Sequence, residues 1–315
     1  MRLVGKRAVI TGSSSGIGRA IANALAKEGA RVVINARGTK AVQDAVEEIR
    51  AGGGTASGMP GAVNDAAFAE RLIQHCVDEF GGIDILINNA GVYTAEAAAR
   101  CSLETWRETL DINLNAAFYM SHFALPHMVA QRWGRILNAA SSNSTGLMGG
   151  AAYSASKSAL LGFTRCIAAD YGRYGITANV YNPEALTAMG AGGDREVFKS
   201  LFRWWNDHGY MSVPEMEYKF GINGPEGVAP WIVYLCLDEA ERYNGQVFCV
   251  ESRRVGMMAW PEEVRALYRD FIQHGPWTID ELHTMAPLAL PSENHWPRRS
   301  DEDIDGWEKH QGSTT

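Results

Sequence analysis

Two residues four positions apart, Tyr153 and Lys157, are the pair in this sequence best suited to acid–base chemistry. On a helix, that spacing places the phenol and the ammonium group on one face. A free tyrosine has a pKa of about 10, too high for a base at neutral pH, but a nearby ammonium group favours the phenolate and lowers that pKa. Tyr153 would then act as general base on an alcohol or, when protonated, as general acid on a ketone. Tyr and Lys at this spacing are also common on exposed helix faces, so the pair needs support from the rest of the chain.

A glycine-rich turn near the N-terminus has the composition of a phosphate-binding loop. It lies between an apolar strand-like run and a helix-like run and reads Thr11-Gly12-Ser13-Ser14-Ser15-Gly16-Ile17-Gly18. Glycine permits a tight turn and close approach of the backbone to a ligand. The helix N-terminus offers free N–H groups and partial positive charge to a pyrophosphate. The turn therefore predicts a dinucleotide site, formed by Gly12, Ser14, Ser15, Gly16, Ile17 and Gly18.

The residues after the second apolar run, Ala36 and Arg37, bear on the choice of dinucleotide. A carboxylate there would bind the ribose hydroxyls of NAD(H) and repel a 2′-phosphate. Ala36 lacks that carboxylate, and the guanidinium of Arg37 can pair bidentately with a phosphate. We therefore predict NADP(H) as the preferred cofactor. NAD(H) is the alternative if Arg37 is an ordinary surface residue.

Short β-branched runs alternate with helix-length amphipathic runs, and these elements must position the motifs. Strands are expected at residues 7–11, 31–35, 83–88, 135–139, 177–181 and 246–250. Helices are expected at 17–28, 40–51, 67–80, 103–131, 153–171 and 228–237, with a kink or break near Pro126. Apolar strands separated by helices predict a parallel sheet covered on both faces. The expected fold class is α/β, a doubly wound parallel sheet of the Rossmann-like type in three layers.

The 315-residue chain is expected to form a single domain with a C-terminal extension. We place the Rossmann-type catalytic domain at residues 1–255, with a substrate lid at about residues 190–227. Residues 256–315 form the extension. Its polar tail, from about residue 291, is expected to be loosely ordered.

The motifs, in this order along the chain, resemble those of the short-chain dehydrogenase/reductase family, in its classical subdivision. The resemblance covers about residues 5–250 and includes the Asn88-Asn89-Ala90-Gly91 motif that follows a predicted strand. It implies a Rossmann-fold oxidoreductase in which the backbone of Val63 serves the adenine and Lys157 holds the nicotinamide ribose. Beside the cofactor it places Val63, Asn89, Ala90, Gly91, Tyr153, Lys157, Pro183, Leu186 and Thr187.

The same resemblance adds two residues to the catalytic set. Asn113 matches the family's asparagine on the long helix, where it would hold a water that relays protons to Lys157. The alternative is a helix asparagine bonded to its own backbone. Ser141 aligns with the serine that hydrogen-bonds the substrate oxygen, but relatives have one more residue before the tyrosine, so Ser142 and Ser144 are alternatives. The predicted catalytic residues are Asn113, Ser141, Tyr153 and Lys157.

Three stretches depart from the family pattern. Ala62 precedes Val63 where relatives carry Asp or Asn beside the adenine. Glu184 replaces a glycine after Pro183, which leaves the backbone path of that loop open. After the last strand, the common D-G-G is replaced by Glu251-Ser252-Arg253-Arg254. The adenine edge, the nicotinamide loop and the C-terminal end are therefore the parts that the resemblance determines least.

The predicted lid is rich in aromatic residues, namely Phe198, Phe202, Trp204, Trp205, Tyr210, Tyr218 and Phe220. These rings suit an apolar substrate, or they pack the lid against its own core or a neighbouring subunit. The helix at 228–237 loosely resembles the family's (R)-3-hydroxyacyl-CoA dehydrogenase and 3-oxoacyl reductase subgroup. We predict interconversion of a ketone and a secondary alcohol, on a 3-oxoacyl or 3-hydroxyacyl thioester or a steroid- or terpenoid-like ketone. The alternative function is a catalytically silent NADP(H)-binding sensor or scaffold protein.

The composition argues against several other classes of protein. A net charge of −7, a pI of about 5.7 and the lack of a basic tract argue against nucleic-acid and membrane partners. No apolar run approaches the ~20 residues that cross a bilayer. The cysteines are scattered without a CxxC pair, which predicts reduced thiols in a cytoplasmic protein without a metal site. The resemblance implies a homodimer or homotetramer, with the Asn113 and Tyr153 helices at the interface.

Overall fold

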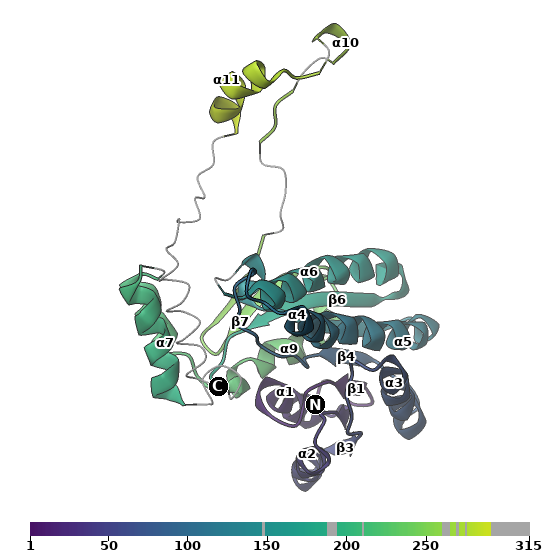
Figure 1. Ribbon diagram of the computed structural model, residues 1–315. Coiled ribbons are helices and arrows are strands. Elements are labelled where there is room, and N and C mark those ends of the chain that lie inside the picture. The colour runs from purple at the N-terminus through teal and green to yellow at the C-terminus, as the bar shows by residue number, and fades with distance from the viewer. Residues whose placement is uncertain are drawn as a thin grey trace. The chain divides into compact units, whose positions relative to one another are not determined.

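An eight-stranded sheet runs through the centre of the fold (Figure 1). The computed structural model describes residues 1–146, 149–187, 194–209, 211–259, 265–268, 271–274 and 276–290. The strands are β1 (Arg7–Ile10), β2 (Arg31–Ile34), β3 (Thr55–Gly58), β4 (Ile85–Asn88), β5 (Gly134–Ala139), β6 (Ile176–Pro183), β7 (Val247–Glu251) and β8 (Arg254–Met257). Their order is β3-β2-β1-β4-β5-β6-β7-β8, and all neighbours are parallel except β7 and β8. The order reverses between β1 and β4, and in such sheets ligands bind at the carboxyl ends of the strands beside this point.

Helices cover both faces of the sheet. One face packs on α1 (Gly16–Lys27), α2 (Thr39–Ala51) and α9 (Ala229–Leu235), and the other on α3 (Ala66–Phe80), α5 (Ala116–Gln131) and α6 (Ala151–Tyr171). Within β1, Ala8 and Ile10 enter the first core and Val9 enters the second, because successive strand residues point to opposite faces. This explains why the strands read as continuous apolar runs. The predicted α/β, doubly wound, three-layered fold is confirmed.

The sequence analysis did not predict two of the strands, β3 and β8. Strand β3 reads Thr-Ala-Ser-Gly, in which only the threonine favours strands, and it forms because it pairs with the apolar β2 at the sheet edge. Strand β8 follows β7 after two residues and turns back antiparallel to it. The sequence predicted a wholly parallel sheet. The sheet instead carries one antiparallel strand, β8, at the edge opposite β3.

The long helix predicted at residues 103–131 is divided, though not at its proline. Helix α4 (Leu103–Leu110) continues through a π-helical turn at Asp111–Asn115 into α5. Pro126 lies inside α5, which runs on to Gln131, so the predicted break at this proline is wrong. Single π-turns inside helices are frequently found at functional sites. This one contains Asn113.

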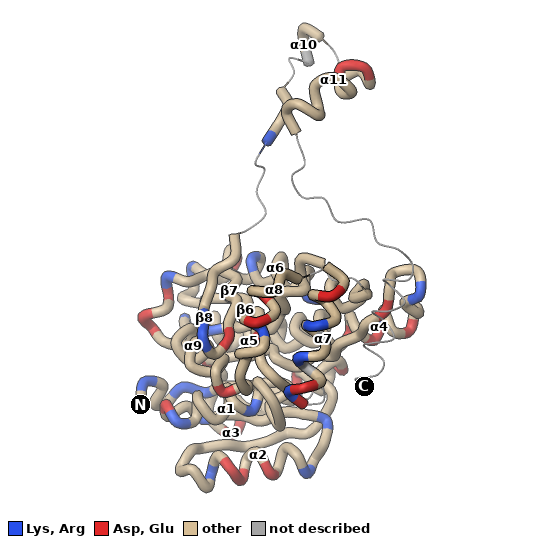
Figure 2. The backbone as a smooth tube through the Cα atoms, turned by 90° about the vertical axis from the view of Figure 1, so that its left-hand side faces the viewer, with Lys and Arg blue, Asp and Glu red and all other residues tan. Residues whose placement is uncertain are grey.

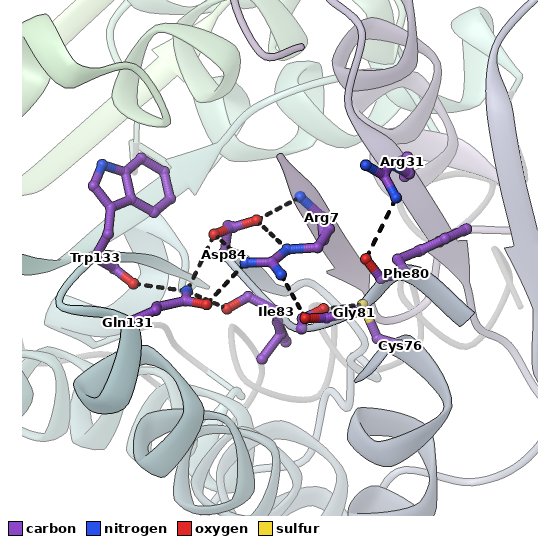
Figure 3. Close-up of polar contacts among 10 residues, drawn as sticks. Arg7, Arg31, Cys76, Phe80, Gly81, Ile83, Asp84, Gln131 and Trp133 are labelled. Atoms are coloured by element: carbon purple, nitrogen blue, oxygen red, sulfur yellow. Dashed lines mark hydrogen bonds and ion pairs between the residues drawn. The ribbon is translucent and has the colours of Figure 1, made fainter. Parts of the chain in front are cut away.

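A polar network ties together the ends of β1 and β4 that lie opposite the switch-point crevice (Figure 3). The Arg7 guanidinium donates two hydrogen bonds to Asp84, Nε to Oδ2 at 2.6 Å and Nη2 to Oδ1 at 2.8 Å, and the Arg7 amide donates a third to Oδ2 at 2.8 Å. At the end of α5, Gln131 donates to the Ile83 carbonyl at 2.6 Å and to Asp84 Oδ1 at 3.1 Å. Asp84 is only 5% exposed. The two strands that flank the switch point are thus pinned to each other and to α5.

The segment predicted as a lid forms two helices, α7 (Arg195–Asp207) and α8 (Val213–Phe220). Both begin at side-chain caps. Asp194 accepts hydrogen bonds from two amides of α7, and Ser212 forms a capping box with Glu215 at the start of α8. Phe202 and Ile222 are buried between these elements. The lid is therefore a small helical layer with its own apolar centre.

Beyond Met258 the described residues belong to a second compact unit. It contains α10 (Phe271–His274) and α11 (Ile279–Ala289), and α11 begins with a capping box of Thr278 and Glu281. The tail from about residue 291, predicted to be loosely ordered, lies outside the described residues.

Charged residues of both signs are interspersed along the described chain (Figure 2). None of the described helices combines the length and the apolar character needed to cross a membrane. The five cysteines are free thiols. Among the described residues, no group of three or more His, Cys, Asp or Glu side chains is arranged to hold a metal ion.

Candidate active site

A cavity of about 580 Å³ opens at the switch point. The predicted site residues that line it are Gly12, Ser14, Ser15, Gly16, Ile17, Arg37, Val63, Asn89, Ala90, Gly91, Tyr153, Lys157, Pro183 and Thr187. Ala36 and Ala62, which the sequence analysis discussed but did not assign to the site, also line it. Residues that the sequence analysis had not named line it as well, namely Asn35, Gly61, Asn64, Val92, Ile112, Ala139 and Ala140. Gly18, Leu186, Asn113 and Ser141 are not among the lining residues. The structure therefore brings most of the predicted site together in one place.

The glycine loop is packed so tightly that larger residues would not fit. A Cβ on Gly12 would lie 2.9 Å from Ala90 Cα, and one on Gly18 would lie 2.4 Å from the Gly12 carbonyl oxygen. Gly12 and Gly16 also have φ values of +64° and +55°, which favour glycine. Gly18 thus supports the loop from behind instead of lining the cavity. The loop keeps its backbone bare at the start of α1, which is the arrangement that binds a pyrophosphate.

The end of the cavity beside β2 carries a cation. Arg37 is exposed, and within the described part of the chain it forms no hydrogen bond or ion pair. Asn35 is buried, and its amide donates to the carbonyls of Met59 and Gly61 at 3.0 and 3.2 Å. Asn64 also lines this end, one residue after Val63. Ala62 stands where relatives carry a polar residue beside the adenine, and Asn64 provides a polar side chain at the same end of the cavity. The sequence analysis overlooked Asn64, although it directly follows Val63.

The Asn-Asn-Ala-Gly motif locks the end of β4 to the glycine loop. The Asn89 side chain donates to the carbonyls of Thr11 and Gly12 at 3.1 and 3.2 Å. In return, the Thr11 hydroxyl accepts from the amides of Asn89 and Ala90, both at 3.0 Å. The neighbouring Asn88 points the other way and donates to Asn138 at 2.8 Å inside the core. The motif therefore sets the distance between the two loops that form the cavity wall.

Tyr153 and Lys157 lie on the first turns of α6, at the inner end of the same cavity. They are 8% and 4% exposed. The Lys157 amine donates to the Ala139 carbonyl at 2.7 Å and lies 5.8 Å from the centre of the Tyr153 ring. Burial lowers the pKa of Lys157 from 10.5 to about 8. The exposed-face interpretation of this pair is thereby excluded.

The pKa of Tyr153 does not move in the predicted direction. Burial raises it, and a hydrogen bond with the Ser141 side chain lowers it only in part. The Lys157 amine, buried and bonded to Ala139, does not offset the burial. The lowering that the Tyr–Lys spacing predicted is therefore absent from the protein without its ligands.

Ser141, of the three serines considered, is the one beside the tyrosine. It caps the short turn Ser142–Thr145, and its hydroxyl accepts from the Asn143 amide at 3.2 Å. Its side chain is also the hydrogen-bond partner of Tyr153. Ser144 is buried, and its hydroxyl has no hydrogen-bond partner in the described part of the chain.

Asn113, in the π-turn, clamps the loop that follows the Asn-Asn-Ala-Gly motif. Its side chain accepts from the Val92 amide at 2.8 Å and donates to the Val92 carbonyl at 3.0 Å. It also donates to Ser156 Oγ at 3.1 Å, and Ser156 donates to the Tyr153 carbonyl at 2.7 Å. The alternative of an asparagine bonded only to its own helix backbone is therefore wrong. Asn113 connects the cavity wall to the helix that carries Tyr153 and Lys157.

Tyr93, the next residue along, was missed by the sequence analysis. Its ring meets that of Tyr153 edge-on, with centroids 5.0 Å apart and planes at 75°. Burial and the neighbouring Tyr153 raise the pKa of Tyr93. Nothing in the sequence around residue 93 signals this contact.

The cavity joins a loop suited to a pyrophosphate with a phenol and an amine at its inner end, and this combination is that of nicotinamide-dependent oxidoreductases. The family model of short chain dehydrogenases matches residues 6–194, and the chain belongs to this family.

Relatives and a solved structure support the same assignment. The chain is 41% identical to the D-beta-hydroxybutyrate dehydrogenase of Cupriavidus necator, over 58% of this chain and 70% of that protein. It is 37% identical to the 3-oxoacyl-(acyl-carrier-protein) reductase FabG of Vibrio cholerae, over 80% and 98%. A short chain dehydrogenase of Burkholderia cenocepacia in complex with NADP matches with a TM-score of 0.70 and 30% identity, over 80% and 98%. The predicted family is confirmed, and the protein is an NAD(P)-binding oxidoreductase that acts on CH–OH or C=O groups.

Proposed function

We propose that this protein interconverts a ketone and a secondary alcohol with NADP(H), and that Tyr153 is its general acid and base. The observation that carries the proposal is the position of Tyr153 and Lys157, both buried at the inner end of the cavity that the glycine loop opens. When bound, the nicotinamide supplies or accepts the hydride. Asn113, Ser141, Tyr153 and Lys157 form the proposed catalytic set.

Each member of the set has a task that its surroundings support. Tyr153 is protonated at neutral pH, because burial raises its pKa, and a protonated phenol is the form that donates to a carbonyl oxygen. Ser141 bonds Tyr153 and offers a second hydroxyl for the substrate oxygen. Lys157, with a pKa of about 8, can exchange a proton near neutral pH and resupply the phenol. Asn113 holds the loop at Val92, and the task we assign to it is to hold a water that relays protons to Lys157.

The preference for NADP(H) rests on Arg37. At the cavity rim its guanidinium has no partner among the described residues and suits a 2′-phosphate, and Ala36 offers no carboxylate to oppose it. The Burkholderia relative was solved with NADP.

The substrate we propose is a 3-oxoacyl or 3-hydroxyacyl compound. The names of the Cupriavidus and Vibrio relatives both describe 3-hydroxy or 3-oxo acids or thioesters. The aromatic lid is weaker support for an apolar substrate, because Phe202 is buried in the lid's own core and Tyr218 bonds Glu251. Tyr210 and the side chain of Phe198 lie outside the described residues.

We also propose a cytoplasmic homodimer or homotetramer that associates through α5 and α6. On α5 the ring of Phe118 is 47% exposed, although it lies 5.9 Å from Phe163 of α6 and stacks on His122 at 5.8 Å. An exposed aromatic cluster of this kind is typical of an interface.

A panel of carbonyl compounds with NADPH and NADH tests the proposed activity, with Tyr153→Phe as the diagnostic variant. We expect NADPH oxidation with 3-oxoacyl thioesters, and a loss of kcat of about 100-fold or more in Tyr153→Phe with unchanged NADPH affinity. Full activity of Tyr153→Phe would refute the catalytic assignment. NADPH binding without turnover on any carbonyl would support the sensor or scaffold alternative instead.

A further inference from the structure

Glu184, the residue that departs from the family pattern after Pro183, forms an ion pair with the lid. Both of its carboxylate oxygens contact the Lys219 amine on α8. The two side chains are 29% and 23% exposed, so the pair is partly shielded from water. Charges in such a setting interact more strongly than a pair on the open surface.

The backbone around Glu184 is fixed on both sides. Its amide donates to the Val250 carbonyl at 2.9 Å, which anchors it to β7. Two residues on, the Leu186 amide donates to the Asn223 carbonyl at 3.0 Å, and the Leu186 side chain packs on the lid core. Pro183 and Thr187, at either end of this stretch, line the cofactor cavity. The stretch at 183–187 therefore has the cavity on one side and the lid on the other.

Helix α8 is also held at its C-terminal end by β7 and the turn that follows it. The Tyr218 hydroxyl donates to Glu251, and Arg253 donates to the Tyr218 carbonyl. These contacts reach β7 and the turn after it, and not the stretch at 183–187. Among the described residues, the ion pair that joins α8 to the stretch at 183–187 is Glu184–Lys219.

We propose that Glu184 and Lys219 are positioning residues that hold the substrate lid against the strand end bordering the cofactor cavity. The inference rests on the proposed function, because it assigns the pair to substrate positioning. It gives the Gly-to-Glu departure a physical role: Glu184, directly after β6, is anchored to β7 through its amide, and its carboxylate holds Lys219 of α8.

The test combines amide hydrogen exchange of α8 with steady-state kinetics on a 3-oxoacyl thioester. In Glu184→Gln and Lys219→Met we expect faster exchange at residues 213–220 and KM for the carbonyl substrate raised about fivefold, with kcat within twofold. The swapped variant, Glu184→Lys with Lys219→Glu, should restore both. Glu196→Gln is the matched control, because Glu196 pairs with Lys199 inside α7 and is 69% exposed. It should leave both readouts at the wild-type level.

Two outcomes would overturn the inference. Wild-type exchange of α8 in Glu184→Gln would show that the pair does not hold the lid. Faster exchange with an unchanged KM would show that the pair does not position substrate. If the wild type reduces no carbonyl compound, the proposed function fails, while the exchange measurement still decides whether the pair holds the lid. If Glu184→Gln does not fold, Lys219→Met and the swapped variant carry the test.

Discussion

At the scale of single residues, burial strongly alters the amine of Lys157. The sequence predicted that Tyr153 and Lys157 belong to one site, because they carry a specific spacing within an ordered series of motifs, and both line the same cavity. It did not predict the state of those residues. Burial sets the pKa of both groups, and burial depends on helices far away in the chain. Only the structure shows that Ser141 is a hydrogen-bond partner of Tyr153, where the sequence left Ser141, Ser142 and Ser144 open.

The low pKa of Lys157 makes the stability of the protein depend on pH in a defined window. Below pH 8 the amine is charged in both the folded and the unfolded chain, and its burial costs about 3 kcal/mol. From about pH 8 to about pH 10.5 the folded chain has released this proton and the unfolded chain has not, so the cost disappears as pH rises. The unfolding free energy of wild type, relative to Lys157→Met, should therefore rise by about 3 kcal/mol across this window.

Urea unfolding of both proteins at a series of pH values measures this difference. Lys27→Met, which removes an exposed lysine of α1, is the control and should show no such rise. A constant difference between wild type and Lys157→Met would contradict the buried, charged amine.

Arg37 should decide the choice of cofactor. Arg37→Gln removes the cation proposed to pair with the 2′-phosphate, and we expect kcat/KM for NADPH to fall about tenfold or more while that for NADH changes little. Lys40→Gln removes a nearby exposed cation outside the cavity and should leave both values unchanged. Equal losses with both cofactors would speak against a 2′-phosphate at this position.

At the scale of elements, the sequence was most successful where burial on two faces forced apolar runs. All six predicted strands exist, with ends shifted by no more than two residues. It failed where a partner creates the element: β3 forms only beside β2, and β8 only beside β7. The π-turn that carries Asn113 leaves no signature in residue types, whereas Pro126, the obvious breaker, is accommodated inside α5.

The Arg7–Asp84 pair should be worth far more to stability than an exposed pair. Asp84→Asn keeps the shape but removes the charge that Arg7 faces at 5% exposure, and we expect a loss of about 2 kcal/mol in unfolding free energy. Asp44→Asn breaks the exposed pair with Lys40, where the two side chains are 51% and 87% exposed, and should cost less than about 0.5 kcal/mol. Chemical denaturation at pH 7 compares them directly. Equal losses would mean that the network in Figure 3 is not a support of β1 and β4.

At the scale of the whole molecule, one sheet with two helical layers builds the cavity at the carboxyl ends of its parallel strands, from the segments that follow β1 to β6. The sequence predicted this architecture from the alternation of elements. The association of chains rests on the exposed aromatic residues of α5 and remains a proposal.

Phe118→Lys should weaken the proposed association. A charge in the centre of an apolar interface loses burial and gains desolvation cost, so the variant should sediment as a smaller species than wild type. Val4→Lys changes a residue that is 70% exposed near the N-terminus and should leave the mass unchanged. A wild-type monomer, or an unaltered oligomer of Phe118→Lys, would show that α5 is not the interface.

The clamp of Asn113 on Val92 has a consequence for how this protein tolerates change in length. One amide side chain occupies both the N–H and the C=O of a single peptide position, as a neighbouring strand would in a ladder. The Asn113 side chain thereby fixes the length of the loop from Asn88 to Val92. An insertion or deletion of one residue there would bring a residue other than Val92 opposite Asn113 and would displace the cavity wall beside Tyr153. A residue inserted a few positions later, in the exposed stretch at 98–100, would leave the hydrogen bonds between Asn113 and Val92 in place and should be tolerated better.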